Sequence, residues 1–72
     1  MTPAAREYLA AYRASEKASK ARAALPAGSS RARVTTVNAR WSSAAEHRDR
    51  LEAALTPADL AEVRARLALE AR

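Results

Sequence analysis

Proline and glycine occur so rarely in this chain that three long stretches contain nothing to interrupt a helix. The 72 residues include one glycine and three prolines, at Pro3, Pro26, Gly28 and Pro57. Alanine has the highest helix propensity, and arginine ranks close behind it. With 21 alanines and 11 arginines, the chain favours helix before any pattern is considered. We therefore expect an all-α fold.

The first stretch begins with a helix start signal and ends at a turn. Thr2 can cap a helix, and Pro3 suits the first helical position because the N–H that proline lacks has no partner there. A helix is predicted over residues 3–24. Residues 25–30 hold a proline, the only glycine and two serines, which are typical turn residues, so we expect the chain to reverse there.

The last stretch repeats this start signal. Thr56 can cap, Pro57 takes the first helical position, and Asp59 places a negative charge in the first turn, where the helix dipole favours it. A third helix is predicted over residues 57–70. The chain, residues 1–72, is then one helical domain: an antiparallel helical hairpin with a shorter third helix.

The middle stretch carries apolar residues at helical spacing. Six apolar residues and one arginine keep a spacing of three and four, namely Val34, Val37, Trp41, Ala44, Arg48, Leu51 and Leu55. One continuous helix is predicted over residues 31–55. A second interpretation breaks it near Ser42 and Ser43, because Ser43 and Glu46 have the spacing of a capping box. That break would allow a helix-turn-helix that reads DNA.

The position of the turn predicts which residues face each other across the hairpin. Equal rise per residue on both helices, counted from a turn centred near Gly28, places Trp41 opposite Ser15 and its small neighbours. We expect these to form a pocket for the large ring. The same count places Arg48 beside Glu7 and Tyr8, a carboxylate and an aromatic ring.

Few large apolar residues are present to build a core. They are seven leucines, three valines, one tryptophan, two tyrosines and one methionine. A chain of this length buries only about 60% of the surface that its unfolded form exposes. Small chains often gain further burial by forming oligomers, and a three-four spacing also suits a helical dimer. The third helix could pack on its own hairpin or on a neighbour's.

The positive charge of the chain is gathered in its first half. The formal net charge is +5. Residues 1–40 hold eight basic and two acidic side chains, whereas residues 41–72 hold five basic and six acidic ones. No acidic residue occurs between Glu16 and Glu46. In a hairpin, all the basic residues of that interval lie at or near the turn.

The turn and the start of the second helix form a candidate phosphate site. Lys17, Lys20 and Arg22 lie near the end of the first helix, where the dipole favours cations. Arg31 and Arg33 lie instead in the first turn of the second helix, where the dipole disfavours them, so a bound anion would relieve that cost. Backbone N–H groups and serine hydroxyls would add to the site. The candidate residues are Lys17, Lys20, Arg22, Ser29, Ser30, Arg31, Arg33 and Arg40.

These features favour a small basic helical binding protein that contacts nucleic-acid phosphates. We expect no aromatic side chain among the basic residues, so the contacts would be made to the backbone and would not depend on sequence. The alternative is a protein-protein interaction module or adaptor that self-associates or docks on an acidic protein surface. A third interpretation is a solvated basic surface that binds nothing.

Catalysis, metal binding and membrane insertion find no support in the residues present. The chain has no cysteine and a single histidine, His47, which excludes a thiolate zinc site and a cysteine nucleophile. It has no glycine-rich phosphate loop or cofactor fingerprint, so we expect no enzyme and no cofactor. It has no apolar run of the length that a membrane span needs. A cytoplasmic protein is predicted, and the arginine- and alanine-rich composition suggests a bacterial or phage origin.

Overall fold

The computed structural model describes all 72 residues and contains three helices and no strand. Helix α1 spans Pro3–Ala23, α2 spans Arg31–Ala53 and α3 spans Pro57–Glu70. The all-α fold, a helical hairpin with a shorter third helix, is therefore confirmed. Helix α2 runs without interruption through Ser42 and Ser43, so the interpretation that breaks it there is wrong.

A hydroxyl side chain caps the start of each helix. The Thr2 hydroxyl accepts a hydrogen bond from the Ala5 N–H at 3.1 Å, and the Ser30 hydroxyl accepts one from the Arg33 N–H at 3.1 Å. Thr56 caps α3 in the same way. Each such cap stabilises its helix by about 1 kcal/mol. The start signals in the sequence therefore act through these hydrogen bonds.

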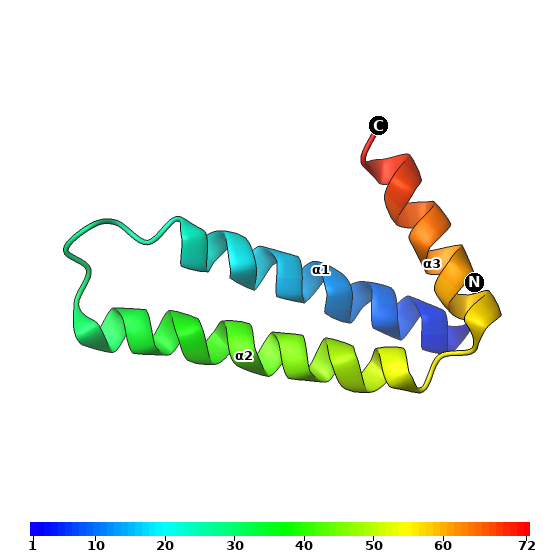
Figure 1. The fold of residues 1–72 in the computed structure, drawn as a ribbon, viewed down its shortest axis with the longest axis horizontal. Helices are drawn as coiled ribbons and strands as arrows, with labels where there is room; N and C mark the ends of the chain where they lie inside the picture. Colours follow the sequence, from blue (N-terminus) through cyan, green and yellow to red (C-terminus); the bar gives the residue numbers. More distant parts are fainter.

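The three helices lie in a single layer, with α1 in the middle. Helices α1 and α2 run antiparallel, and α3 crosses the start of α1 and then leads away from the hairpin (Figure 1). The Cα atoms extend over 44 × 27 × 14 Å, so the molecule is about one helix thick. Helix α3 packs on α1. Helix α2 therefore has a neighbour mainly on one side.

The core lies where α3 meets α1. Its buried residues are Ala5, Tyr8, Leu9 and Val63. The larger side chains packed against them are only partly buried, namely Met1, Tyr12, Leu51, Leu55, Leu60 and Leu67. Helix α2 contributes no buried residue. The end of the hairpin that bears the turn thus lacks a core of its own.

The residues that face each other across the hairpin differ from the prediction. The Tyr8 hydroxyl donates to Glu52 at 3.1 Å, and Arg48 donates to the Ser15 hydroxyl at 3.2 Å. Helix α2 is thus shifted along α1 by about one to two helical turns from the expected register. The reason is the segment 24–30, which is extended enough for the first turns of α2 to project beyond the end of α1 (Figure 1).

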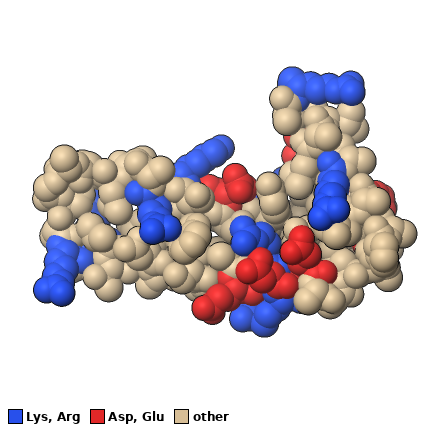
Figure 2. All heavy atoms as spheres, in the orientation of Figure 1, with Lys and Arg blue, Asp and Glu red and all other residues tan.

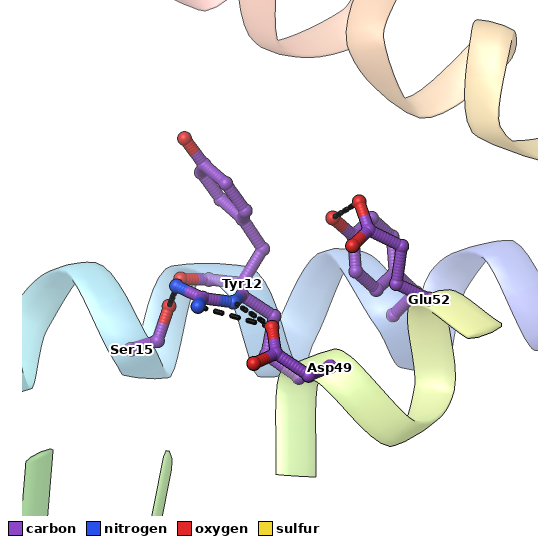
Figure 3. Close-up of polar contacts among 6 residues, drawn as sticks. Tyr12, Ser15, Asp49 and Glu52 are labelled. Carbon is purple, nitrogen blue, oxygen red and sulfur yellow. Dashed lines mark hydrogen bonds and ion pairs between the residues drawn. The ribbon is translucent and has the colours of Figure 1, made fainter. Parts of the chain in front are cut away.

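This shift gives Arg48 partners other than Glu7. Ser15 is fully buried, and its hydroxyl donates to the Tyr12 carbonyl at 2.8 Å while it accepts from Arg48. Arg48 also pairs with its neighbour Asp49 at 3.1 Å (Figure 3). The arginine in the apolar stripe of α2 is therefore neutralised and hydrogen-bonded, as a partly buried charge requires.

The burial of Tyr8, together with its contact with Glu52, makes the stability of the fold depend on pH in the alkaline range. Burial, and next the hydrogen bond to Glu52, raise the pKa of Tyr8 above its ordinary value of 10.0. A raised pKa means that the folded state holds this proton more tightly than the unfolded state. This stabilisation is complete below pH 10 and is lost as the pH rises through the pKa of the folded state.

We expect the free energy of unfolding to fall more steeply above about pH 10 in the wild type than in Tyr8→Phe. Urea unfolding, followed by circular dichroism over a series of pH values, measures the difference. Tyr12→Phe is the matched control, because Tyr12 is partly buried and its hydroxyl makes no hydrogen bond within the chain. Identical pH dependence in Tyr8→Phe and the wild type would contradict the prediction.

Candidate anion-binding site

The fold gathers six basic residues at the end of the hairpin that bears the turn. We call them the basic end: Lys17, Lys20, Arg22, Arg31, Arg33 and Arg40. All six are exposed, and none takes part in an ion pair. On the face shown in Figure 2, the charged side chains near the turn are all basic, and acidic ones begin at the middle of the hairpin. The segregation of charge along the sequence is therefore also a segregation in space.

The two serines of the predicted site are used to build the turn. The Ser29 hydroxyl donates to the Pro26 carbonyl at 2.7 Å, and the Ser30 hydroxyl accepts the capping bond from Arg33. Gly28, which precedes both serines, has a φ of +82°, which a glycine adopts without strain. Ser29 and Ser30 therefore hold the start of α2 in place. Only the hydroxyl hydrogen of Ser30 is left to donate to an anion.

Arg31 and Arg33 occupy the most projecting part of the basic end. They lie in the first turn of α2, which extends past the end of α1 (Figure 1). No acidic residue lies in that turn, and the N–H groups of Arg31 and Ala32 make no hydrogen bond within the chain. Two guanidinium groups and two free N–H groups thus lie at the positive end of a helix dipole.

Lys17 and Arg40 are brought together from different helices. Both line a groove of about 250 Å³ between α1 and α2, together with small apolar side chains, Ala14, Ala18, Ala21 and Val37. Because these apolar side chains are small, the floor of the groove is open to the backbone of a ligand. The sequence places these two cations at the same end of the hairpin, but it does not place them in one groove.

Arg22 covers an aromatic ring. Its guanidinium carbon lies 4.5 Å from the centre of the Trp41 ring, which is only partly buried. The expectation that no aromatic accompanies the basic residues is therefore wrong, and the ring of Trp41 lies beside Arg22 rather than opposite Ser15, which meets Arg48. Arg22 and Lys17 are five residues apart, which places them on different sides of α1. The basic end thus surrounds the hairpin.

A second group of arginines was not predicted. Arg6, Arg13 and Arg66 line a hollow of about 350 Å³ between α1 and α3. Acidic residues counter the charge there, because Glu70 pairs with Arg13 and Glu62 pairs with the N-terminal amine. No spacing in the sequence relates Arg66 to Arg6, so only the docking of α3 reveals the group. Its local charge balance distinguishes it from the basic end.

No family model, curated protein or solved structure matches the chain. No cluster of three or more histidine, cysteine, aspartate or glutamate side chains is arranged to hold a metal ion. None of the three helices is long and apolar enough to cross a membrane. The site is therefore interpreted from its own charges and contacts.

Proposed function

We propose that the chain binds nucleic-acid phosphates through its basic end. The observation that carries this proposal is the set of six exposed basic side chains without an ion pair. Like charges gathered without acidic partners repel one another. The phosphates of a polyanion relieve that repulsion, and the counterions that it releases on binding add to the affinity. Binding, rather than catalysis, is the role that such a surface supports.

Most contacts of this kind are made to phosphates and do not depend on base sequence. Arg31 and Arg33 reach furthest from the body of the molecule, and they can pair with phosphate oxygens through two parallel N–H bonds each. Trp41 adds an aromatic ring in the basic end. Because bases stack on such rings, we expect a single strand to bind at least as well as a duplex.

Salt dependence tests this function directly. A mixed-sequence single strand and a duplex are titrated with the protein at several salt concentrations, beside the double variant Arg31→Ala, Arg33→Ala. For each lost phosphate contact, the slope of log K against log salt flattens by about 0.9 on a duplex and about 0.7 on a single strand. We expect two contacts to be lost in the double variant.

The matched control is Arg64→Ala, Arg66→Ala on α3, which removes the same two charges at the same spacing. We expect this control to keep a slope close to that of the wild type. Equal slopes in the two double variants would show that net charge, rather than the basic end, drives binding. Absence of binding at low salt would overturn the proposed function.

A second candidate function is a protein-interaction module that self-associates or docks on an acidic protein surface. The observation that favours it is the absence of any buried residue in α2, although this is the longest helix. Only six of the 72 residues are buried. Because a helix of a folded domain normally buries one face, the exposure of α2, which packs mainly on α1, leaves room for a further partner.

A further inference from the structure

One side of α2 that α1 does not cover bears a shallow hollow. Helix α2 lies at the edge of the layer, so this side is open to solvent (Figure 1). The hollow measures about 830 Å³, and all eight residues that line it belong to α2. Its longer side chains, Arg40, His47 and Arg50, lie among smaller ones that include Ala39 and Ser43. All five are exposed, so a ligand can reach them without any change in the packing of the helices.

Basic side chains recur along this side of α2. Arg33, Arg40 and His47 follow one another at intervals of seven residues, and Arg50 comes one turn later. An interval of seven returns to the same side of a helix within about 20° and advances about 10.5 Å along it. We call these four residues the α2 row, which is about 25 Å long. The helix dipole acts only in the first and last turns, so it does not explain Arg40 and His47.

The acidic residues of α2 lie outside the hollow. They are Glu46, Asp49 and Glu52, and none of them lines it. Asp49 pairs with Arg48, and Glu52 accepts a hydrogen bond from Tyr8. No member of the α2 row takes part in an ion pair. Charge is therefore segregated around α2 as well as along the hairpin.

The hollow offers hydrogen-bond donors that the fold does not use. The Ser43 hydroxyl lies between Arg40 and His47 in the sequence and makes no hydrogen bond within the chain, whereas the Thr36 hydroxyl donates to the Ala32 carbonyl. Guanidinium, imidazole and hydroxyl groups can all donate to phosphate oxygens, which only accept. Arg40 also lines the groove that contains Lys17, so the hollow is continuous with the basic end.

We propose that the phosphate backbone of one nucleic-acid strand continues from the basic end along α2, where Arg40, Ser43, His47 and Arg50 contact it. This inference rests on the proposed function and extends its site to the middle of the hairpin. Phosphates of a stacked strand are about 3.4 Å apart, so the α2 row corresponds to about seven nucleotides. A single strand and one strand of a duplex present the same chemistry.

A gain of one contact tests this path. Ser43→Arg adds a cation to the hollow, and Ser42→Arg adds the same charge at the neighbouring exposed position, which does not line the hollow. Both variants are titrated with a single strand of twelve nucleotides, and with a duplex of that length, at several salt concentrations. We expect Ser43→Arg to steepen the slope of log K against log salt by about 0.7 on the single strand or 0.9 on the duplex.

At 0.1 M salt this steeper slope corresponds to binding that is about five- to tenfold tighter. We expect Ser42→Arg to keep a slope close to that of the wild type, because its side chain lies one turn before Glu46 on a different side of α2. Unfolding cannot produce a gain in affinity. Steepening with either ligand supports the path, and the ligand that shows it identifies whether the strand is single or paired.

A loss of one contact tests the far end of the path. Arg50→Ala is expected to flatten the slope by the same amount, whereas Arg64→Ala on α3 removes an equal charge and leaves the slope unchanged. Equal slopes for Ser43→Arg and Ser42→Arg, or for Arg50→Ala and Arg64→Ala, would overturn the path along α2. Binding at the basic end would stand if Arg31→Ala, Arg33→Ala still flattened the slope. A wild type that binds neither ligand at low salt would overturn the proposed function itself.

Discussion

Leu9→Ala is expected to lower the free energy of unfolding by about 2 to 5 kcal/mol. Leu9 is 5% exposed, and it belongs to a core of only four buried residues. The substitution removes apolar contacts and leaves a cavity that rigid helices fill incompletely. A small domain has a total stability of only about 5 kcal/mol or somewhat more, so most of it would be lost. Urea unfolding followed by circular dichroism measures the change.

Leu69→Ala is the matched control for this prediction. It deletes the same atoms from the same residue type in a helix, but Leu69 is 59% exposed. We expect its effect on the free energy of unfolding to stay within about 0.5 kcal/mol. Both variants are measured at one protein concentration, because association would stabilise the folded state. Equal effects at Leu9 and Leu69 would mean that the core lies elsewhere.

Helix ends could be predicted because local chemistry determines them. Thr2, Ser30 and Thr56 each cap a helix through a contact three residues away, and such contacts are visible as spacing in the sequence. The continuity of α2 could be predicted for the same reason, since its apolar stripe keeps one phase. The capping box at Ser43 failed as a signal because a helix already formed on both sides leaves no end to cap.

The register of the hairpin could not be predicted from equal rise alone. It depends on the path of the segment 24–30, and a few backbone angles there move α2 by a whole turn. Every predicted contact across the hairpin shares this error. Trp41 therefore meets Arg22, and Arg48 meets Ser15, although both residues lie on the expected side of α2.

The basic end could be predicted in outline because charge counts do not depend on register. Any hairpin with this turn brings Lys17, Lys20, Arg22 and Arg40 to one end. Two details depend on how the two helices pack and could not be predicted. One is the groove that Lys17 and Arg40 both line, and the other is the Trp41 ring beneath Arg22. A serine beside a helix start can bind either an anion or its own backbone, so the sequence alone does not reveal that Ser29 donates to the Pro26 carbonyl and that Ser30 caps α2.

Arg31→Glu with Arg33→Glu is expected to weaken nucleic-acid binding by more than about a hundredfold at 0.1 M salt. Each duplex phosphate contact contributes roughly tenfold there, and the introduced carboxylates also repel the strand. The same change is expected to stabilise the folded protein. The dipole at the start of α2 favours negative charge by about 0.3 to 1 kcal/mol for each residue, and the first turn of the wild type has none.

The double variant is expected to weaken binding and to raise stability, so a loss of binding cannot be explained by unfolding. Cations at the start of α2 lower the stability of the fold, because the helix dipole is positive there. If the basic residues served only to keep the protein in solution, other positions would serve equally well without this cost. Arg64→Glu with Arg66→Glu lowers the net charge equally, and we expect it to weaken binding far less and to leave thermal unfolding nearly unchanged. Binding titrations and thermal melts of both variants decide the matter. If Arg31→Glu, Arg33→Glu is more stable than the wild type and binds as tightly, the basic end is not where nucleic acid binds.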